Sequence, residues 1–282
     1  MAKPKVLVFL GTSRQGAATI DALLESGNFD VYATTRSKKS AEALKARCVK
    51  VVPFKNGNKA SAKAALDAAD PSLVYFTTLA GSRKVEGSQG KIIVDAIKEK
   101  GGVEHVVYSS VVSADIAPDA VRHFKSKLDV EEHLKASGLG FSILRPVAFF
   151  ENYDCPAEHN PLKKGSVTGP WPSELKVKHV SVVDIGKVAV AMLAAPSEWT
   201  GRTLECASDD VSGNDIAAAL TGVSRVECKY KPLPRFVMRW FMKDLNAMVH
   251  FFEDQGYVDA DIAAFKAVVP DALDCTAWFK KK

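Results

Sequence analysis

The sequence lacks the cysteine pairs on which a disulfide framework or a zinc site depends. Its 282 residues include five cysteines, which are scattered along the chain and never spaced as Cys-x-x-Cys. It also lacks any apolar run near the roughly 18 residues of a membrane-spanning helix, and it enters a predicted strand almost at once. These absences argue against a disulfide-rich secreted domain, a metal site and a membrane-spanning protein. We therefore expect a cytoplasmic protein, since its thiols suit a reducing compartment.

A basic stripe of the kind that binds nucleic acid is missing as well. Lysine and arginine number 38 against 33 aspartates and glutamates, but both signs are interspersed apart from the terminal Lys280-Lys281-Lys282. Such a pattern is typical of a solvated surface. We expect neither nucleic acid nor a membrane as partner, and the hydrophobic fraction of 47% indicates an ordinary globular core.

What the sequence does contain is a regular alternation of predicted strands and helices. The predicted strands cover residues 6–10, 29–36, 49–52, 72–78, 105–110 and 141–146. The segments between them are rich in helix-forming residues, so a helix is expected between most successive strands. This alternation predicts an α/β protein with a doubly wound parallel sheet, and it places a dinucleotide-binding Rossmann domain at residues 1–150.

A smaller α+β subdomain for a substrate or partner is predicted at residues 151–282, in part returning to the Rossmann core. Residues 151–178 are rich in proline, glycine, asparagine and charge, which predicts an irregular lid loop. Cys155 and His159 in this loop raise the hypothesis of a redox-sensing thiol. Residues 236–252 are rich in apolar side chains, for which we predict a helix packed on the main body, with a protein contact as the alternative.

Two helix starts in this second part are marked by capping residues. Asp184 is predicted as the N-cap of a helix that runs to Ala195, because an aspartate side chain accepts from free backbone amides. Ser212 and Asp215 have the spacing of a capping box, which predicts another helix through Leu220.

The first predicted strand ends in a turn that suits a dinucleotide phosphate. The residues of this turn are Leu10, Gly11, Thr12, Ser13, Arg14, Gln15 and Gly16. Phosphate binding at such a turn needs small residues and free backbone N–H groups at a helix N-terminus. Gly11, Ser13 and Gly16 meet part of that requirement, although a plain strand-to-helix turn has the same pattern.

The end of the second predicted strand favours NADP(H) over NAD(H). An acidic residue at this place usually accepts from the ribose hydroxyls of NAD, whereas this chain has Arg36, followed by Lys38. A guanidinium matches a phosphate dianion, so Arg36 is predicted to pair with the 2′-phosphate, with Lys38 in support. A solvated basic helix start is the alternative interpretation.

Two later segments resemble a known family. They read HFKSKLDVEEHL at residues 123–134 and ILRPVAFFEN at residues 143–152, and a weaker likeness extends from residue 5 to about residue 279. Both segments are similar to the NmrA-like family of atypical short-chain dehydrogenases. The resemblance implies an extended Rossmann fold that binds NADP(H), with a smaller C-terminal subdomain over the cofactor cleft. It also implies that NADPH-dependent reductases and redox-sensing regulators are both possible functions.

The resemblance places the cofactor contacts on particular residues. They are Gly11, Thr12, Ser13, Arg14, Gln15, Gly16, Arg36, Lys38, Thr77, Thr78, Ser109, Lys127, Phe149 and Asn152. The family's Gly-Ala-Thr-Gly-x-x-Gly turn falls on residues 10–16, where only the third glycine is kept. Leu10 replaces the glycine of the tight turn, and Ser13 puts a Cβ where the backbone approaches the pyrophosphate. The usual acidic residue after the third strand is also missing, which leaves the adenine contacts open.

The residues for catalysis depart from those of ordinary short-chain dehydrogenases. Their Tyr-x-x-x-Lys pattern becomes His123-x-x-x-Lys127 here, which places both side chains on one helix face. Lys127 is expected to contact the nicotinamide ribose. His123 is a candidate proton donor near neutral pH, with a purely structural histidine as the alternative.

Three functions stay open on this sequence. The first is an NADP(H)-binding, redox-responsive regulator or weak oxidoreductase that lacks the catalytic tyrosine, and its partners would be the dinucleotide and a regulatory protein. The second is an NADPH-dependent reductase of a small apolar carbonyl, quinone or enone. The third is a Rossmann scaffold without cofactor. The sequence is compatible with a monomer or a homodimer.

Overall fold

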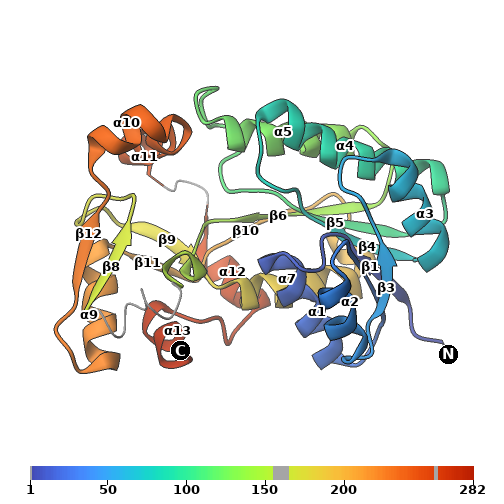
Figure 1. Ribbon diagram of the computed structural model, residues 1–282, viewed down its shortest axis with the longest axis horizontal. Helices are drawn as coiled ribbons and strands as arrows, with labels where there is room; N and C mark the ends of the chain where they lie inside the picture. Colours follow the sequence, from blue (N-terminus) through green and yellow to red (C-terminus); the bar gives the residue numbers. More distant parts are fainter. Residues whose placement is uncertain (1, 155–164, 257–259) are drawn as a thin grey trace.

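A seven-stranded parallel sheet forms the centre of the protein (Figure 1). The computed structural model describes residues 2–154, 165–256 and 260–282. The strand order is β10-β6-β5-β4-β1-β2-β3. The strands are β1 (Lys5–Val8), β2 (Asp30–Thr35), β3 (Lys50–Pro53), β4 (Leu73–Phe76), β5 (His105–Ser109), β6 (Phe141–Pro146) and β10 (Thr203–Cys206). The predicted α/β Rossmann fold with a parallel sheet is therefore confirmed.

Helices cover both faces of this sheet (Figure 1). One face carries α1 (Arg14–Ser26), α2 (Lys38–Lys45) and α7 (Val182–Ala194), and the other carries α3 (Lys59–Ala69), α4 (Arg83–Lys100) and α5 (Arg122–Lys135). In β1, Val6 and Val8 pack into the core beneath α1, α2 and α7, and Leu7 packs into the core on the other face of the sheet. This is expected, because side chains alternate along a strand. The unbroken apolar run of β1 thus reflects burial on both faces.

The second half of the chain adds two small sheets beside the large one. One has the order β11-β9-β7 and the other pairs β12 with β8. Their strands are β7 (Ala148–Phe149), β8 (Ser166–Gly169), β9 (Val177–Val180), β11 (Asp209–Val211) and β12 (Lys229–Pro232). The other elements are the 3-10 helix η1 (Phe150–Tyr153) and the helices α8 (Pro196–Trp199), α9 (Gly213–Ser224), α10 (Arg235–Phe241), α11 (Lys243–Gln255), α12 (Ile262–Val268) and α13 (Cys275–Lys280).

The prediction of an irregular loop at residues 151–178 is wrong for much of its described part. η1, β8 and the start of β9 fall within it. These strands are short and pair with β12 and β11 from far along the chain, so no local pattern announces them. Cys155 and His159 lie outside the described residues, and the domain boundary at residue 150 stays a prediction.

Serine caps start two helices in this half of the chain. The predicted capping box is confirmed, because Ser212 Oγ accepts from Asp215 N and the Asp215 carboxylate accepts from Ser212 N. The predicted N-cap Asp184 is wrong, since α7 is capped by Ser181 and begins at Val182. Asp184 instead accepts from the backbone N–H of Leu273 at 2.8 Å, which ties α7 to the C-terminal segment.

The apolar stretch at 236–252 forms two helices with different surroundings. In α11, Val249, Phe251 and Phe252 are buried, as predicted. In α10, Met238 is buried, whereas Phe236 is 66%, Trp240 71% and Phe241 82% exposed. The prediction that this stretch packs on the main body is therefore wrong for α10.

A buried carboxylate ties η1 to two later parts of the chain. Glu151 accepts from Ser181 Oγ at 2.8 Å, from Val182 N at 3.0 Å and from Trp278 Nε1 at 2.9 Å. The three donors satisfy a charge that would be costly to bury unpaired. Across the described ranges, no helix combines the length and apolar character that a membrane crossing demands.

His179 in β9 is a fully buried histidine that is held neutral. Its Nδ1–H donates to Val177 O at 2.7 Å, which leaves Nε2 to accept from the hydroxyl of Tyr153 at 2.9 Å. Phe150 stacks on the same ring, with centroids 5.3 Å apart. Burial lowers the pKa of His179 from 6.5 to about 4, because the imidazolium would lose its hydration.

We predict that His179 makes the fold sensitive to acid. The imidazole of His179 is protonated near pH 6.5 in the unfolded chain and only near pH 4 in the folded protein. As the pH falls through this interval, the free energy of unfolding therefore decreases. Between roughly pH 7 and pH 5 the loss is about 2 kcal/mol. Urea unfolding at both pH values should show a smaller loss for His179→Gln than for the wild type. Tyr153→Phe keeps the imidazole and should behave like the wild type; an unchanged acid loss in His179→Gln would contradict the account.

Candidate functional site

The turn between β1 and α1 keeps its tight form around Leu10. Leu10 has a φ of 53°, in the left-handed region where the related pattern has glycine, at a strain of roughly 1–2 kcal/mol. Its N–H donates to Thr34 Oγ1 at 2.9 Å, and its carbonyl accepts from Ser13 N at 2.8 Å. A Cβ on Gly16 would lie 2.4 Å from Leu10 O, so only glycine fits there. The backbone turn therefore forms with one of the three glycines.

The N-terminus of α1 retains free donors for an anion. Ser13 is the N-cap, and its Oγ accepts from Gly16 N at 3.1 Å. In the described part of the chain, the backbone N–H groups of Arg14 and Gln15 have no acceptor. Two free amides at a helix start fit a phosphate group. Ser13 thus occupies one donor but leaves the site open to a pyrophosphate.

A cavity of about 240 Å³ lies beside this turn. Its lining includes Leu10, Thr12, Ser13, Thr34, Thr35, Arg36, Phe54, Asn56 and Leu79. An adjoining hollow of about 410 Å³ is lined by Arg36 together with Lys38, Lys45 and Lys55. Neither Arg36 nor Lys38 has an acidic partner among the described residues, so their charges are available to an anionic ligand.

Asn56 is a residue of this cavity that the sequence did not single out. Its Nδ2 donates to Gln89 Oε1 at 2.6 Å, and the same oxygen accepts from Leu79 N at 3.2 Å. Asn56 Oδ1 is buried and, within the described ranges, has no hydrogen-bond partner. An unsatisfied acceptor at this depth suits an amino group of a ligand. Asn56 lies in the segment after β3, in which the acidic residue expected from the resemblance is missing.

The carboxyl ends of β4 and β5 meet the start of α1. Ser109 Oγ donates to Gln15 Oε1 at 2.5 Å, and Thr77 Oγ1 donates to Ser109 O at 3.2 Å. Arg14 reaches across to Asn152 Oδ1 at 3.4 Å. The structure therefore brings together five of the predicted cofactor residues from the turn, from β4 and β5, and from η1.

Lys127 is held in a buried polar cluster. Its Nζ lies 2.9 Å from Glu86 Oε1 and donates to Thr78 Oγ1 at 3.1 Å, while Thr78 Oγ1 donates to Glu86 at 2.8 Å. Glu86 is only 1% exposed. No sequence pattern pointed to Glu86, because it lies on another helix, α4, 41 positions before Lys127. Lys127 and Thr78 are thereby fixed at the edge of the sheet where the predicted site lies.

His123 pairs with an acidic residue of α11. Its Nδ1 lies 2.5 Å from Asp244 Oδ2, and Asp244 Oδ1 accepts from the backbone N–H of Arg122 at 2.6 Å. With Nδ1 engaged, Nε2 is the ring nitrogen left to meet a ligand. The sequence could not reveal Asp244, since 121 residues separate it from His123.

His123 lines an apolar cavity of about 500 Å³. Its apolar lining is Ala80, Val111, Val112, Phe124, Val147, Ala148, Phe149, Gly169, Pro170, Trp171, Leu245, Met248 and Phe252. Its polar lining is His123, Asn152, Tyr153, Thr168 and His179. Phe149 and Asn152 thus lie where the sequence expected a site, whereas Phe150 is fully buried against His179 and Trp278. The cavity suits an apolar molecule with few polar groups.

Relatives of known name align with most of this chain. An NmrA-like family domain-containing oxidoreductase of Aspergillus campestris is 28% identical over 254 residues, which are 81% of this chain and 75% of that protein. Quinone oxidoreductase 2 of Escherichia coli is 25% identical over 228 residues, 79% of this chain and 75% of that protein. Both alignments extend well beyond the opening turn.

Solved structures share the fold at lower identity. The NADPH-dependent quinone oxidoreductase of Escherichia coli, complexed with NADPH, has a TM-score of 0.80 at 19% identity. The structural alignment covers 98% of this chain and 99% of that protein's chain. NmrA, a negative transcriptional regulator in complex with NAD, has a TM-score of 0.76 at 17% identity and covers 100% and 95%. At this identity the likeness concerns the fold alone.

The family model covers nearly the whole sequence. The NmrA-like family matches residues 2–278, which include the opening turn, both halves of the chain and the C-terminal helices. The predicted resemblance is therefore confirmed, and the chain belongs to the NmrA-like family.

Proposed function

We propose that this protein is an NADPH-dependent reductase of a flat apolar acceptor, with a quinone as the substrate class. The observation that carries the proposal is the His123–Asp244 pair at the wall of the apolar cavity. A reductase of this kind needs a dinucleotide site, an adjacent apolar pocket and a proton donor.

The residues at the opening turn fit NADP(H). The free amides of Arg14 and Gln15 would hold the pyrophosphate, and Arg36 would pair with the 2′-phosphate. Asn56 Oδ1 would accept from the adenine amino group, in place of the missing acidic residue. Gly11, Thr12, Ser13, Gly16, Lys38, Thr77, Thr78 and Ser109 complete the proposed cofactor contacts. When bound, NADPH supplies the hydride.

The cavity supplies the second requirement. Its walls of valine, phenylalanine, tryptophan and methionine exclude water and bind an aromatic ring. Asn152 hydrogen-bonds Arg14 of the turn and also lines the cavity, so the dinucleotide site and the cavity are adjacent. The Escherichia coli relative is named as a quinone oxidoreductase, which agrees with such a pocket.

His123 supplies the third requirement. Reduction of a quinone to a hydroquinone takes one hydride, which carries both electrons, and one proton. The Asp244 carboxylate fixes the ring so that Nδ1–H points to it, and protonated Nε2 donates to the substrate oxygen. Lys127 is paired with Glu86 and is proposed to hold the ribose rather than to move the proton.

A nucleotide-dependent regulator is the second candidate. The observation that favours it is Lys127, which is neutralised by Glu86 and has no tyrosine one turn before it. A structural relative is named as a negative transcriptional regulator. Full NADPH binding without turnover of any quinone or enone would favour this candidate over the reductase.

We predict that NADPH stabilises the protein more than NADH does. A ligand that binds only the folded state raises the melting temperature, and a 2′-phosphate on Arg36 adds a charge-assisted bond that NADH lacks. Thermal unfolding with each nucleotide should show the difference, and Arg36→Ala should abolish it. Arg47→Ala, which removes a guanidinium paired with Asp21 outside both cavities, is the control. Equal stabilisation of the wild type by both nucleotides would contradict the assignment of Arg36.

We predict that His123→Asn lowers kcat for quinone reduction by about 100-fold, because a general acid contributes at least that factor. In the same assay, Asp244→Asn should lower kcat less. His133→Asn is a matched control, since His133 lies on the same helix as His123, pairs with Asp95 of α4 and does not line the cavity. NADPH oxidation followed by absorbance measures all four proteins. An unchanged kcat in His123→Asn would refute the role of this residue.

A further inference from the structure

α10 exposes more apolar surface than a helix of a folded domain normally does. Phe236, Trp240, Phe241 and Met242 are 66%, 71%, 82% and 40% exposed, and only Met238 anchors the helix. The other large exposed apolar side chains in the described ranges are single residues in the sequence. A contiguous patch of this kind marks an interaction site.

The segment that holds the patch is mainly basic, although Lys229 pairs with Glu227. Residues 229–243 contain five basic residues and no acidic one, namely Lys229, Lys231, Arg235, Arg239 and Lys243. Arg235 pairs with Glu253, whereas Lys231, Arg239 and Lys243 have no acidic partner in the described part of the chain. The partner that covers α10 therefore has to accept positive charge.

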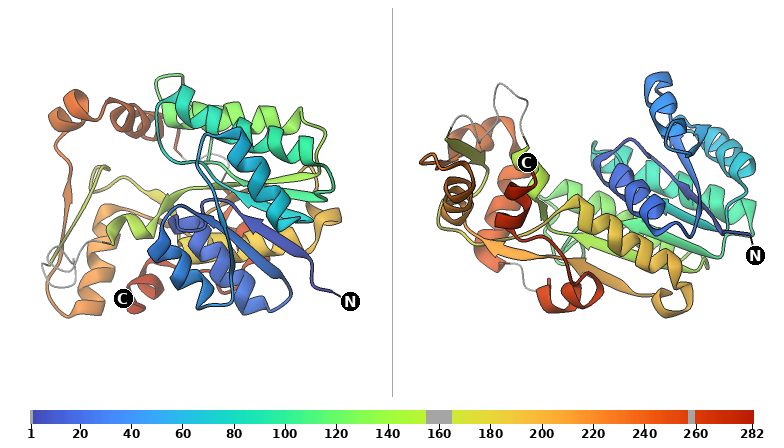
Figure 2. Two further views of the ribbon diagram at one scale, coloured as in Figure 1. Left: turned by 45° about the vertical axis from the view of Figure 1, so that its right-hand side comes forward. Right: turned by 90° about the horizontal axis from the view of Figure 1, so that it is seen from below.

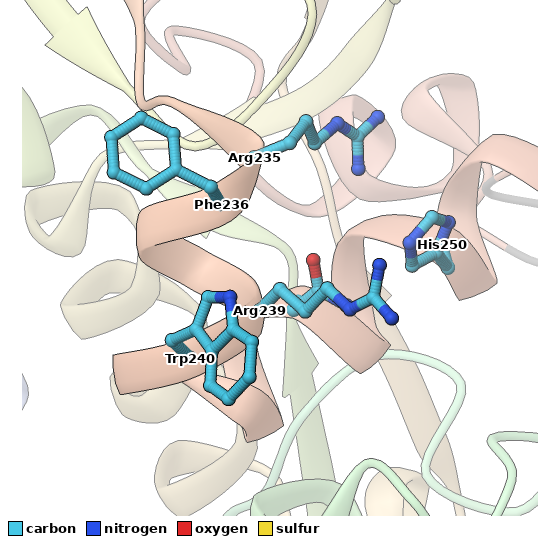
Figure 3. A pocket seen from close by; sticks show the side chains of 6 residues that line it. Arg235, Phe236, Arg239, Trp240 and His250 are labelled. Atoms are coloured by element: carbon cyan, nitrogen blue, oxygen red, sulfur yellow. The ribbon is translucent and has the colours of Figure 1, made fainter.

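The aromatic and basic side chains leave α10 in different directions. Figure 3 shows Phe236 and Trp240 on one side of the helix, and Arg235 and Arg239 extended to the other side, toward His250. Together they line an open hollow of about 550 Å³ between α10 and α11. At 100° per residue, Phe236, Trp240, Val237 and Phe241 form one continuous apolar arc with the arginines at its edge. This is the arrangement of a helix that lies at the surface of a bilayer.

We propose that α10 docks the protein on a lipid bilayer with anionic headgroups. Phe236, Trp240 and Phe241 would enter the interface, where aromatic rings are favoured, and Arg239 and Lys243 would meet the lipid phosphates. Three of the five basic residues are lysines, which protein interfaces disfavour, so a lipid fits this patch better than a protein does. The position of α10 at the end of the molecule opposite the N-terminus leaves room for a flat surface (Figure 2).

This docking differs from the expectation drawn from the sequence. That expectation excluded a membrane partner because the sequence has no apolar run long enough to span a bilayer. A peripheral helix requires no such run. The inference does not depend on the proposed reductase activity. α11 follows α10 directly and lines the apolar cavity with Leu245, Met248 and Phe252. The proposed docking would therefore bring this helix close to the lipid.

The test is flotation of the whole protein with vesicles of phosphatidylcholine alone and with about 30% phosphatidylserine. We expect binding to the anionic vesicles to be at least about tenfold stronger and to weaken as salt is added. The tryptophan emission of the wild type should shift to the blue on binding, and that of the double variant described next should not. The double variant Trp240→Ser/Phe241→Ser should lose this binding with its melting temperature unchanged, because both side chains are exposed. Lys280→Glu/Lys281→Glu, a charge change at the C-terminus, is the control and should still bind.

Three results would overturn the proposal. They are no preference for anionic vesicles, undiminished binding by the double variant, and equal loss of binding in the C-terminal control. If analytical ultracentrifugation finds a dimer that the double variant converts to a monomer, and vesicles stay unbound, then a second copy of the chain covers α10 and the proposal is wrong.

Discussion

The buried carboxylate of Glu151 is the constraint on which the arrangement of the cavity depends. It gathers donors from Ser181, from Val182 and from Trp278, and so joins η1 to α7 and to α13. Removing one donor would leave a buried charge partly unsatisfied, which is strongly unfavourable. Because Phe149 and Asn152 flank Glu151 in the sequence, the same contacts fix two residues of the cavity wall.

The chemistry of the site comes from segments that are distant in the sequence. α5 provides His123 and Lys127, while their partners Asp244 and Glu86 come from α11 and α4. The two pairs differ in kind. The first is partly exposed and lines the cavity, so it suits proton transfer, whereas the second is buried and suits a fixed position. This difference is why we propose His123, rather than Lys127, as the proton donor.

Much of the fold could be predicted, because local sequence determines it. Apolar runs such as that of β1 mark buried strands. The pairing of Arg36 with a 2′-phosphate stays a prediction. Glu86, Asn56 and Asp244 could not be found, since their roles depend on tertiary contacts. The predicted helix start at Asp184 was wrong for a different reason, because Ser181 is an equally good N-cap three residues earlier. The composition of α10 could not show its exposure, because core and interface helices have similar residues.

The central claim is that the opening turn, with Leu10 in place of a glycine, still holds NADP(H) beside the cavity. Native mass spectrometry of the whole protein in an equimolar mixture of NADPH and NADH tests it most directly, because each complex has its own mass. The account predicts one bound dinucleotide per chain and a clear excess of the NADPH complex. Absence of both complexes, or equal amounts of the two, would contradict it.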